Sequence, residues 1–194
     1  MLFIFDMAGV VTNSSCMKNI CTKLCIGLDD FYIFQLDSDG GNTYQNLSLG
    51  LISPEEYWSN FSHNSNIEIS EDLFKELYKP EVDNSIIFLI NELKIRGHRV
   101  VCCTNTIESH FREHLRLGNY SIFDFVYSSH LMGVKKPNPE IFKRIIDIER
   151  SLPEDIYFID DDVRNIEVAQ DIGINAHLYF SSEKLEKYLS HFLL

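Results

Sequence analysis

The sequence predicts an α/β fold, in which a doubly wound parallel sheet carries a small α-helical cap inserted after its first strand. The opening run Met1-Leu-Phe-Ile-Phe is short and apolar and ends in the carboxylate of Asp6, which is typical of a buried parallel strand. From residue 84 onward, short apolar runs alternate with helical patterns of 10–15 residues, which indicates a parallel sheet. The block over 14–80 shows helical patterns and no convincing strand. We therefore expect that block to be an insertion.

These patterns also divide the chain. We expect residues 1–13 and 81–194 to form the α/β core and residues 14–80 to form the helical cap. Within the cap, Ser53-Pro-Glu-Glu combines a capping serine, a proline at the first helical position and acids in the first turn, which is typical of a helix start. Ser70-Glu-Asp predicts a second helix start.

The core elements follow in order. Gly97, Gly118 and Gly173 close three predicted helices, as glycine does at helix ends. Asn138 and Asp162 stand where they can cap the helices that follow them. The predicted elements are a helix over 86–96, a strand over 99–104, a helix over 107–117, a strand over 123–127, a helix over 139–149, a strand over 156–159, a helix over 163–172, a strand over 176–179 and a helix over 184–193.

Composition excludes several classes of protein. A chain of 194 residues can form one domain with a good core and a small appended one. The net charge of −12 argues against a general nucleic-acid-binding surface. No apolar run approaches the roughly 18 residues of a membrane span, and no basic segment precedes the first strand, so no secretory leader is expected. We expect a cytoplasmic monomer without nucleic-acid or membrane partners.

Cysteine and histidine spacing gives little sign of a transition-metal site. The five cysteines form no CxxC pair, so we expect buried, reduced thiols. His110 and His114 stand four residues apart, but no nearby acid completes a zinc-binding pattern. We expect this pair to lie on an exposed helix face.

Four predicted strands end in polar side chains or are soon followed by them. Because parallel strands place their carboxyl ends on one edge of a sheet, these groups can converge. Together they offer carboxylates, a hydroxyl, backbone N–H groups and a cation, which suit Mg²⁺ and a phosphate bound side by side. The groups are, in chain order, Asp6, Thr104 with Asn105, Lys136, and Asp160 with Asp161.

With these motifs the chain resembles the haloacid dehalogenase (HAD) superfamily, and the resemblance implies a Rossmann-like core with a small helical cap. Its motifs stand in family order with family-like spacing over nearly the whole chain. Within the superfamily the chain looks most like bacterial sugar-phosphate phosphatases of the α-D-glucose-1-phosphate phosphatase type, which share its opening residues, the Gly97-His-Arg-Val-Val strand and its short length. The matching segments are Phe5-Asp6-x-x-Gly9-Val10, Thr104-Asn105, Lys136-Pro137-x-Pro139-Glu140-Ile-Phe142, and Phe158-Ile-Asp160-Asp161-x-x-x-Asn165.

The resemblance implies a role for each motif in a phosphatase. Asp6 would attack phosphorus and form an aspartyl-phosphate. Mg²⁺ would be held by the Asp6 carboxylate, the backbone carbonyl of Ala8 and Asp160. Asp161 would act through a water or orient Lys136.

The phosphoryl group would be held by the remaining motifs. The Thr104 hydroxyl and the Asn105 N–H would bind it, and Lys136 would neutralise its charge and that of Asp6. We expect the adjacent Lys135 to be solvated.

Ala8 departs from the family pattern. Most phosphatases of the superfamily carry an aspartate at this position, which protonates the leaving group and later activates water. One explanation is a good leaving group such as a sugar C1 oxygen. Another is a substitute acid, for which Asp37, Asp39, His63 or a metal-bound water are available. A third is a different activity.

These explanations give three hypotheses. The first is a Mg²⁺-dependent phosphatase that acts on small phosphate esters, such as a sugar 1-phosphate. The second is a phosphonatase-type C–P hydrolase, which shares the Asp-x-Ala-Gly motif and uses a cap lysine, here Lys18 or Lys23, as a Schiff base. The third is a catalytically weak binding or regulatory protein.

Overall fold

A computed structural model describes residues 1–13, 15–37 and 40–193. Its five-stranded sheet is entirely parallel and has the order β5-β4-β1-β6-β7, which confirms the predicted α/β fold. β1 lies at the centre, where Phe5 pairs with Cys102 on one side and Ile159 on the other. The strands are β1 (Leu2–Phe5), β4 (Arg99–Thr104), β5 (Phe125–Ser128), β6 (Ile156–Asp160) and β7 (Asn175–Leu178).

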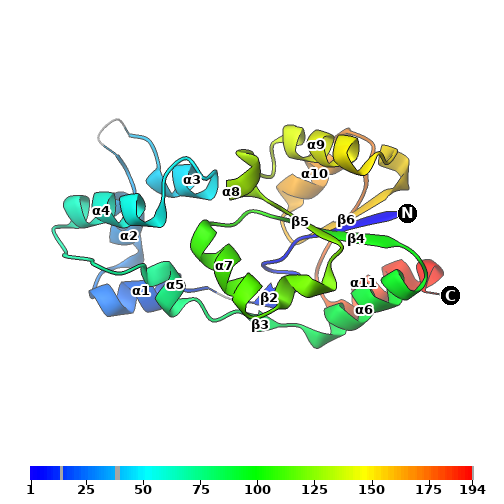
Figure 1. Ribbon diagram of the computed structural model, residues 1–194, viewed down its shortest axis with the longest axis horizontal. Helices are drawn as coiled ribbons and strands as arrows, with labels where there is room; N and C mark the ends of the chain where they lie inside the picture. The colour runs from blue at the N-terminus through cyan, green and yellow to red at the C-terminus, as the bar shows by residue number, and fades with distance from the viewer. Residues whose placement is uncertain (14, 38–39, 194) are drawn as a thin grey trace.

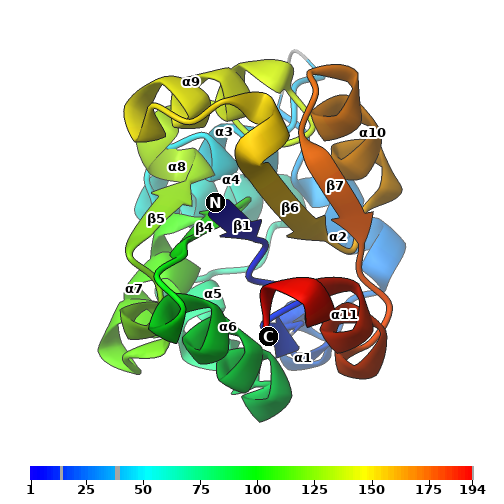
Figure 2. The ribbon, with the colours of Figure 1, turned by 90° about the vertical axis from the view of Figure 1, so that its right-hand side faces the viewer.

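Helices cover both faces of this sheet (Figure 2). Phe3 and Phe5 of β1 pack with residues of α6 (Asn84–Ile95) and α11 (Ser182–Leu189). Leu2 and Ile4 point the other way and pack with α9 (Pro139–Glu149) and α10 (Val163–Asp171). Burial on both faces explains why β1 is apolar at every position.

Most predicted elements lie within two residues of their expected bounds. Asn138 caps α9, because its side-chain oxygen accepts the N–H of Glu140. Asp162 caps α10 in the same way, because its side-chain oxygen accepts the N–H of Arg164. The C-terminal helix is shorter than expected, since α11 ends at Leu189 and a 3₁₀ turn follows. The remaining core elements are α7 (Glu108–Arg116), η1 (Asn119–Ile122), α8 (Ser129–Met132), η2 (Pro153–Asp155) and η3 (Ser190–Phe192).

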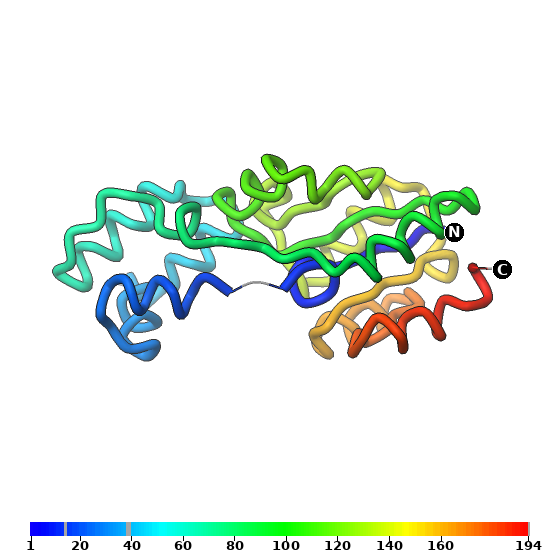
Figure 3. Tube along the Cα trace, turned by 90° about the horizontal axis from the view of Figure 1, so that it is seen from below, coloured from blue at the N-terminus to red at the C-terminus, as the bar shows by residue number. Residues whose placement is uncertain are grey.

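The helices between residues 13 and 81 lie together beyond the carboxyl ends of the sheet strands and away from both chain termini (Figures 1 and 3). A core of their own joins them, with Tyr57, Trp58 and Phe61 buried at its centre. Ser53 caps α4 through the N–H of Glu56. The helices are α1 (Met17–Leu24), α2 (Leu28–Phe34), α3 (Thr43–Ser48), α4 (Pro54–Ser65) and α5 (Leu73–Leu77).

A short antiparallel ribbon joins this helical layer to the core. β2 (Thr12–Asn13) pairs with β3 (Glu81–Val82), so the chain leaves the core and returns to it at one place. The boundaries expected at residues 13 and 81 fall on this ribbon.

Two further findings concern composition. No helix in the described part of the chain is both long and apolar enough to cross a membrane. The five cysteines are free, and four of them are buried as expected, whereas Cys25 is exposed because it follows α1 at its solvent-facing end.

Candidate active site

Asp6 stands where β1 stops, at the carboxyl edge of the sheet. Its N–H donates to the carbonyl of Ile159 at 2.9 Å, so the residue is held against β6. The residue is 8% exposed, and its carboxylate accepts the N–H of Met7 at 2.7 Å. Burial raises the pKa of Asp6 to about 7, although the charge of Lys136 pulls it down.

Lys136 joins two of the predicted site carboxylates. Its Nζ lies 2.9 Å from Oδ1 of Asp6 and 2.6 Å from Oδ2 of Asp160, and the side chain is 1% exposed. Burial lowers the pKa of Lys136, but the charges of Asp6 and Asp160 outweigh burial and raise it well above its usual value. The other Asp160 oxygen accepts the N–H of Asp162 at 2.8 Å and the amide of Asn165 at 2.9 Å. Asn165 therefore positions Asp160, a role that its motif alone did not reveal.

The donor set fits a divalent cation. Asp6, Asp160 and Asp161 each offer a carboxylate oxygen, and these oxygens lie within 4.8 Å of one another. Carboxylate oxygens are the ligands that Mg²⁺ prefers. Three carboxylates beside the single ammonium of Lys136 leave an excess of negative charge, which a cation would offset.

Gly9 is explained by its closeness to this cluster. A Cβ at Gly9 would lie 2.2 Å from Oδ2 of Asp161, and the backbone φ of +89° is one that side chains disfavour. A larger residue here would displace Asp161.

Thr104 and Asn105 follow β4 to the same edge. Thr104 is 2% exposed at the end of the strand. The Asn105 side chain donates to the carbonyl of Lys136 at 2.8 Å and accepts its N–H at 2.9 Å. Asn105 thus fixes the backbone that carries Lys136. The expectation that Lys135 is solvated is wrong, because its ammonium reaches Oγ of Ser48 in the helical layer at 3.3 Å and the side chain is half-buried.

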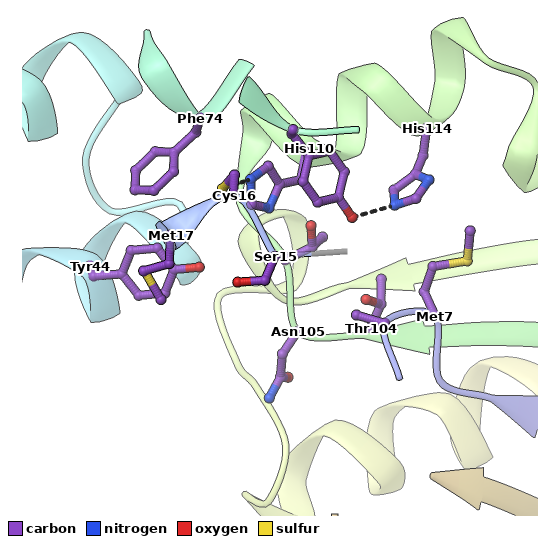
Figure 4. A pocket seen from close by; sticks show the side chains of 13 residues that line it. Met7, Ser15, Cys16, Met17, Tyr44, Phe74, Thr104, Asn105, His110 and His114 are labelled. Carbon is purple, nitrogen blue, oxygen red and sulfur yellow. Dashed lines mark hydrogen bonds between the residues drawn. The ribbon is translucent and has the colours of Figure 1, made fainter. Parts of the chain in front are cut away.

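A cavity of about 170 Å³ opens beside these groups, between the helical layer and the core. Ala8, Thr104 and Asn105 form part of its wall at the sheet edge. Met17 and Phe74 line it from the helical layer (Figure 4). The cavity therefore begins where a phosphate would be held and extends toward α1 and α5.

His110 and His114 also line this cavity, so the expectation of an exposed helix face is wrong. His114 is 2% exposed; its Nε2 lies 2.8 Å from the Tyr78 hydroxyl and its Nδ1 3.0 Å from the Asn119 amide. Nε2 of His110 lies 3.5 Å from Sγ of Cys16. The pair is covered because α7 lies between the sheet and the helical layer (Figure 1). The four-residue spacing is the only feature of the sequence that singles out this pair.

Burial keeps both histidines neutral. It lowers the pKa of His110 to about 3, with a further contribution from His114. It lowers the pKa of His114 to about 4, although Glu113 acts in the opposite direction.

The alternative acids and lysines lie elsewhere. Lys18 and Lys23 are exposed, and Lys23 pairs with Glu76. Neither lysine lines the cavity, nor do Asp37 and His63. Asp39 lies outside the described residues.

Comparison with known proteins identifies relatives of this chain. Residues 1–173 match the haloacid dehalogenase-like hydrolase family. The sesquiterpene phosphatase astK of Aspergillus oryzae is 28% identical over 182 residues, which cover 90% of this chain and 88% of that protein. The D-ribitol-5-phosphate phosphatase of Bacteroides thetaiotaomicron is 24% identical over 189 residues, which cover 88% and 87%.

A solved structure shares the fold. It is a HAD family enzyme from Bacteroides thetaiotaomicron in complex with magnesium and inorganic phosphate. The TM-score is 0.76 at 22% identity, over 92% of this chain and 93% of that one.

Proposed function

We propose that this chain, which belongs to the haloacid dehalogenase-like hydrolases, is a Mg²⁺-dependent phosphatase that hydrolyses small phosphate monoesters through an aspartyl-phosphate at Asp6. The observation that carries the proposal is the Lys136 ammonium, held 2.9 Å from Asp6 and 2.6 Å from Asp160 with Asp161 alongside. Two relatives that are themselves phosphatases support it. We divide the chain into a core of residues 1–13 and 81–194 and a cap of residues 14–80.

Each residue of the site has a defined part in this reaction. The Asp6 carboxylate attacks phosphorus, the ester P–O bond breaks, and the alcohol half leaves as an alkoxide that takes its proton from water. The Thr104 hydroxyl and the Asn105 N–H hold the phosphoryl oxygens. Lys136 offsets the negative charge that gathers between the phosphoryl group and Asp6. Water then cleaves the aspartyl-phosphate and releases phosphate.

Magnesium fits the same residues. Asp6, Asp160 and the carbonyl of Ala8 would hold it, with Asp161 acting through a water. When bound, it supplies positive charge to the phosphoryl oxygens. Mg²⁺ in the solved HAD family complex supports this assignment.

Ala8 restricts the leaving group. Its methyl group cannot donate a proton, so the alcohol has to leave without help from this position. The sequence resemblance predicts a sugar 1-phosphate, because a C1 oxygen leaves more readily than an ordinary alcohol. The relative that acts on D-ribitol 5-phosphate supports a sugar phosphate, and the sesquiterpene phosphatase supports an apolar one.

A substrate screen tests the activity. We expect the protein with Mg²⁺ to hydrolyse 4-nitrophenyl phosphate and at least one ester of a panel that holds both sugar phosphates, such as glucose 1-phosphate, and apolar monophosphates. Chelation should lower the rate by at least about 10²-fold, because a bound metal supplies several kcal/mol of transition-state stabilisation. Added Mg²⁺ should restore it. Binding without turnover across the panel would instead favour a regulatory protein.

Ala8→Asp tests the leaving-group argument. A carboxyl group at this position should raise turnover of alkyl phosphates by roughly 10²-fold, since general acid catalysis is worth that much or more. The rate with 4-nitrophenyl phosphate should change little, because nitrophenolate needs no proton. Ala8→Asn is the matched control, with the same shape and no acid. An equal gain in both variants would contradict the argument.

A further inference from the structure

The cavity beside Ala8 and Thr104 is the place where the alcohol half of the substrate would lie (Figure 4). From its lining we infer that this half is uncharged and largely apolar, and about the size of a six-membered ring. The inference rests on the proposed function, because it assumes that the phosphate is held at Asp6 and Thr104. The inference favours apolar monophosphates over sugar phosphates as the substrate class.

The first argument is charge. Within the described part of the chain, no aspartate, glutamate, lysine or arginine lines the cavity. Of the two histidines in its wall, His114 is buried and His110 partly buried, and both are neutral because desolvation lowers their pKa values. The cavity therefore offers no ion pair to a carboxylate, an amine or a second phosphate on the alcohol.

The second argument is that several polar side chains of the wall already have partners, although Ser15 and Tyr44 also bring hydroxyl groups to it. The His110 ring pairs with Cys16, and the Tyr78 hydroxyl pairs with His114. The Thr106 hydroxyl donates to a backbone carbonyl at 3.4 Å. A polyol would have to break such contacts or leave its own hydroxyls unpaired, and burying an unpaired hydroxyl is costly.

The third argument is the apolar part of the lining. Met7, Met17 and Phe74 contribute apolar side chains from both sides of the cavity (Figure 4). Thioethers and aromatic rings adapt well to apolar ligands. A volume of about 170 Å³ slightly exceeds that of an apolar cavity known to hold one benzene molecule, about 150 Å³.

A matched pair of ligands tests the inference. Cyclohexyl phosphate and myo-inositol 1-phosphate share a six-carbon ring and differ in the ring hydroxyls. We would titrate both into Asp6→Asn in the presence of Mg²⁺, so that neither is consumed, and take the ratio of their dissociation constants. We expect cyclohexyl phosphate to bind at least about tenfold more tightly, because a pocket discriminates by the groups it can pair. Inhibition constants against 4-nitrophenyl phosphate with the unmodified protein give the same ratio independently.

A pair of substitutions locates the effect in the cavity. Met17 lines it, and the neighbouring Lys18 is exposed on the same helix. Met17→Glu should weaken cyclohexyl phosphate binding by about tenfold or more, because it places a charge beside an apolar ligand. Lys18→Glu makes a larger change in net charge and should alter binding by less than about twofold, since an exposed charge at this distance is screened.

The outcomes separate the two proposals. Equal or tighter binding of inositol phosphate, or equal effects of the two substitutions, would overturn the apolar assignment. If the unmodified protein then still hydrolysed 4-nitrophenyl phosphate, the phosphatase proposal would stand. No turnover of any ester, together with preferred binding of cyclohexyl phosphate, would overturn the phosphatase proposal and keep the apolar cavity.

Discussion

Replacing Asp6 with asparagine is expected to lower kcat for 4-nitrophenyl phosphate by at least about 10³-fold, since loss of a catalytic nucleophile costs this much or more. The amide has the shape of the carboxylate but cannot attack phosphorus. It can still accept the N–H of Met7, so the local fold should survive. Steady-state rates with saturating Mg²⁺ measure the effect.

Asp162→Asn is the control for this substitution. Asp162 is also an acid at the carboxyl edge of the sheet, but it caps α10 and pairs with Arg164. Asparagine is an equally good capping residue, so kcat should change by less than about threefold. Thermal unfolding of both variants shows whether a loss of rate reflects a loss of structure. A rate that survives Asp6→Asn in a folded protein would rule out the aspartyl-phosphate.

The predicted core follows from local patterns. β1 is apolar at every position because both of its faces are covered, and such a run is visible in the sequence. Since all strands of the sheet are parallel, their carboxyl ends share one edge. This rule brings Asp6 and Asp160 to one edge without knowledge of any single contact, whereas Lys136 reaches them from the loop that follows α8.

The cavity could not be predicted in the same way. Cys16 and His110 are separated by 94 residues, and Tyr78 and His114 by 36, so no local pattern links them. The spacing of His110 and His114 shows only that they share a side of a helix. Whether that side faces solvent depends on where the helical layer packs.

Lys135 and Lys136 also show the difference between what a local motif predicts and what depends on distant packing. They are adjacent and chemically identical, yet one bridges two buried carboxylates and the other reaches the helical layer. A motif could distinguish them, because the proline that follows Lys136 belongs to the family pattern. Composition and charge alone could not, since the contact of Lys135 is with Ser48, far away in the chain.

Lys136→Met is expected to destabilise the protein as well as inactivate it. Methionine keeps the length of the side chain but removes the charge, which leaves Asp6 and Asp160 facing each other without a counterion. Removing one partner from a buried ion pair costs about 3–5 kcal/mol. Because burial already raises the pKa of Asp6 to about 7, protonation of Asp6 can absorb part of this cost, so the lower end of that range is expected near pH 7.

Urea denaturation in a chelating buffer measures the loss in the free energy of unfolding, and the same experiment in Mg²⁺ tests its cause. If carboxylate repulsion is responsible, Mg²⁺ should restore part of the stability, since a cation that binds only the folded protein stabilises it. Lys135→Met is the matched control and should cost less than about 1 kcal/mol, because its half-buried side chain contacts one hydroxyl and, among the described residues, forms no ion pair with a carboxylate. An equal cost for both lysines, or a loss that Mg²⁺ does not reduce, would mean that Lys136 acts by packing and not as the counterion of the site.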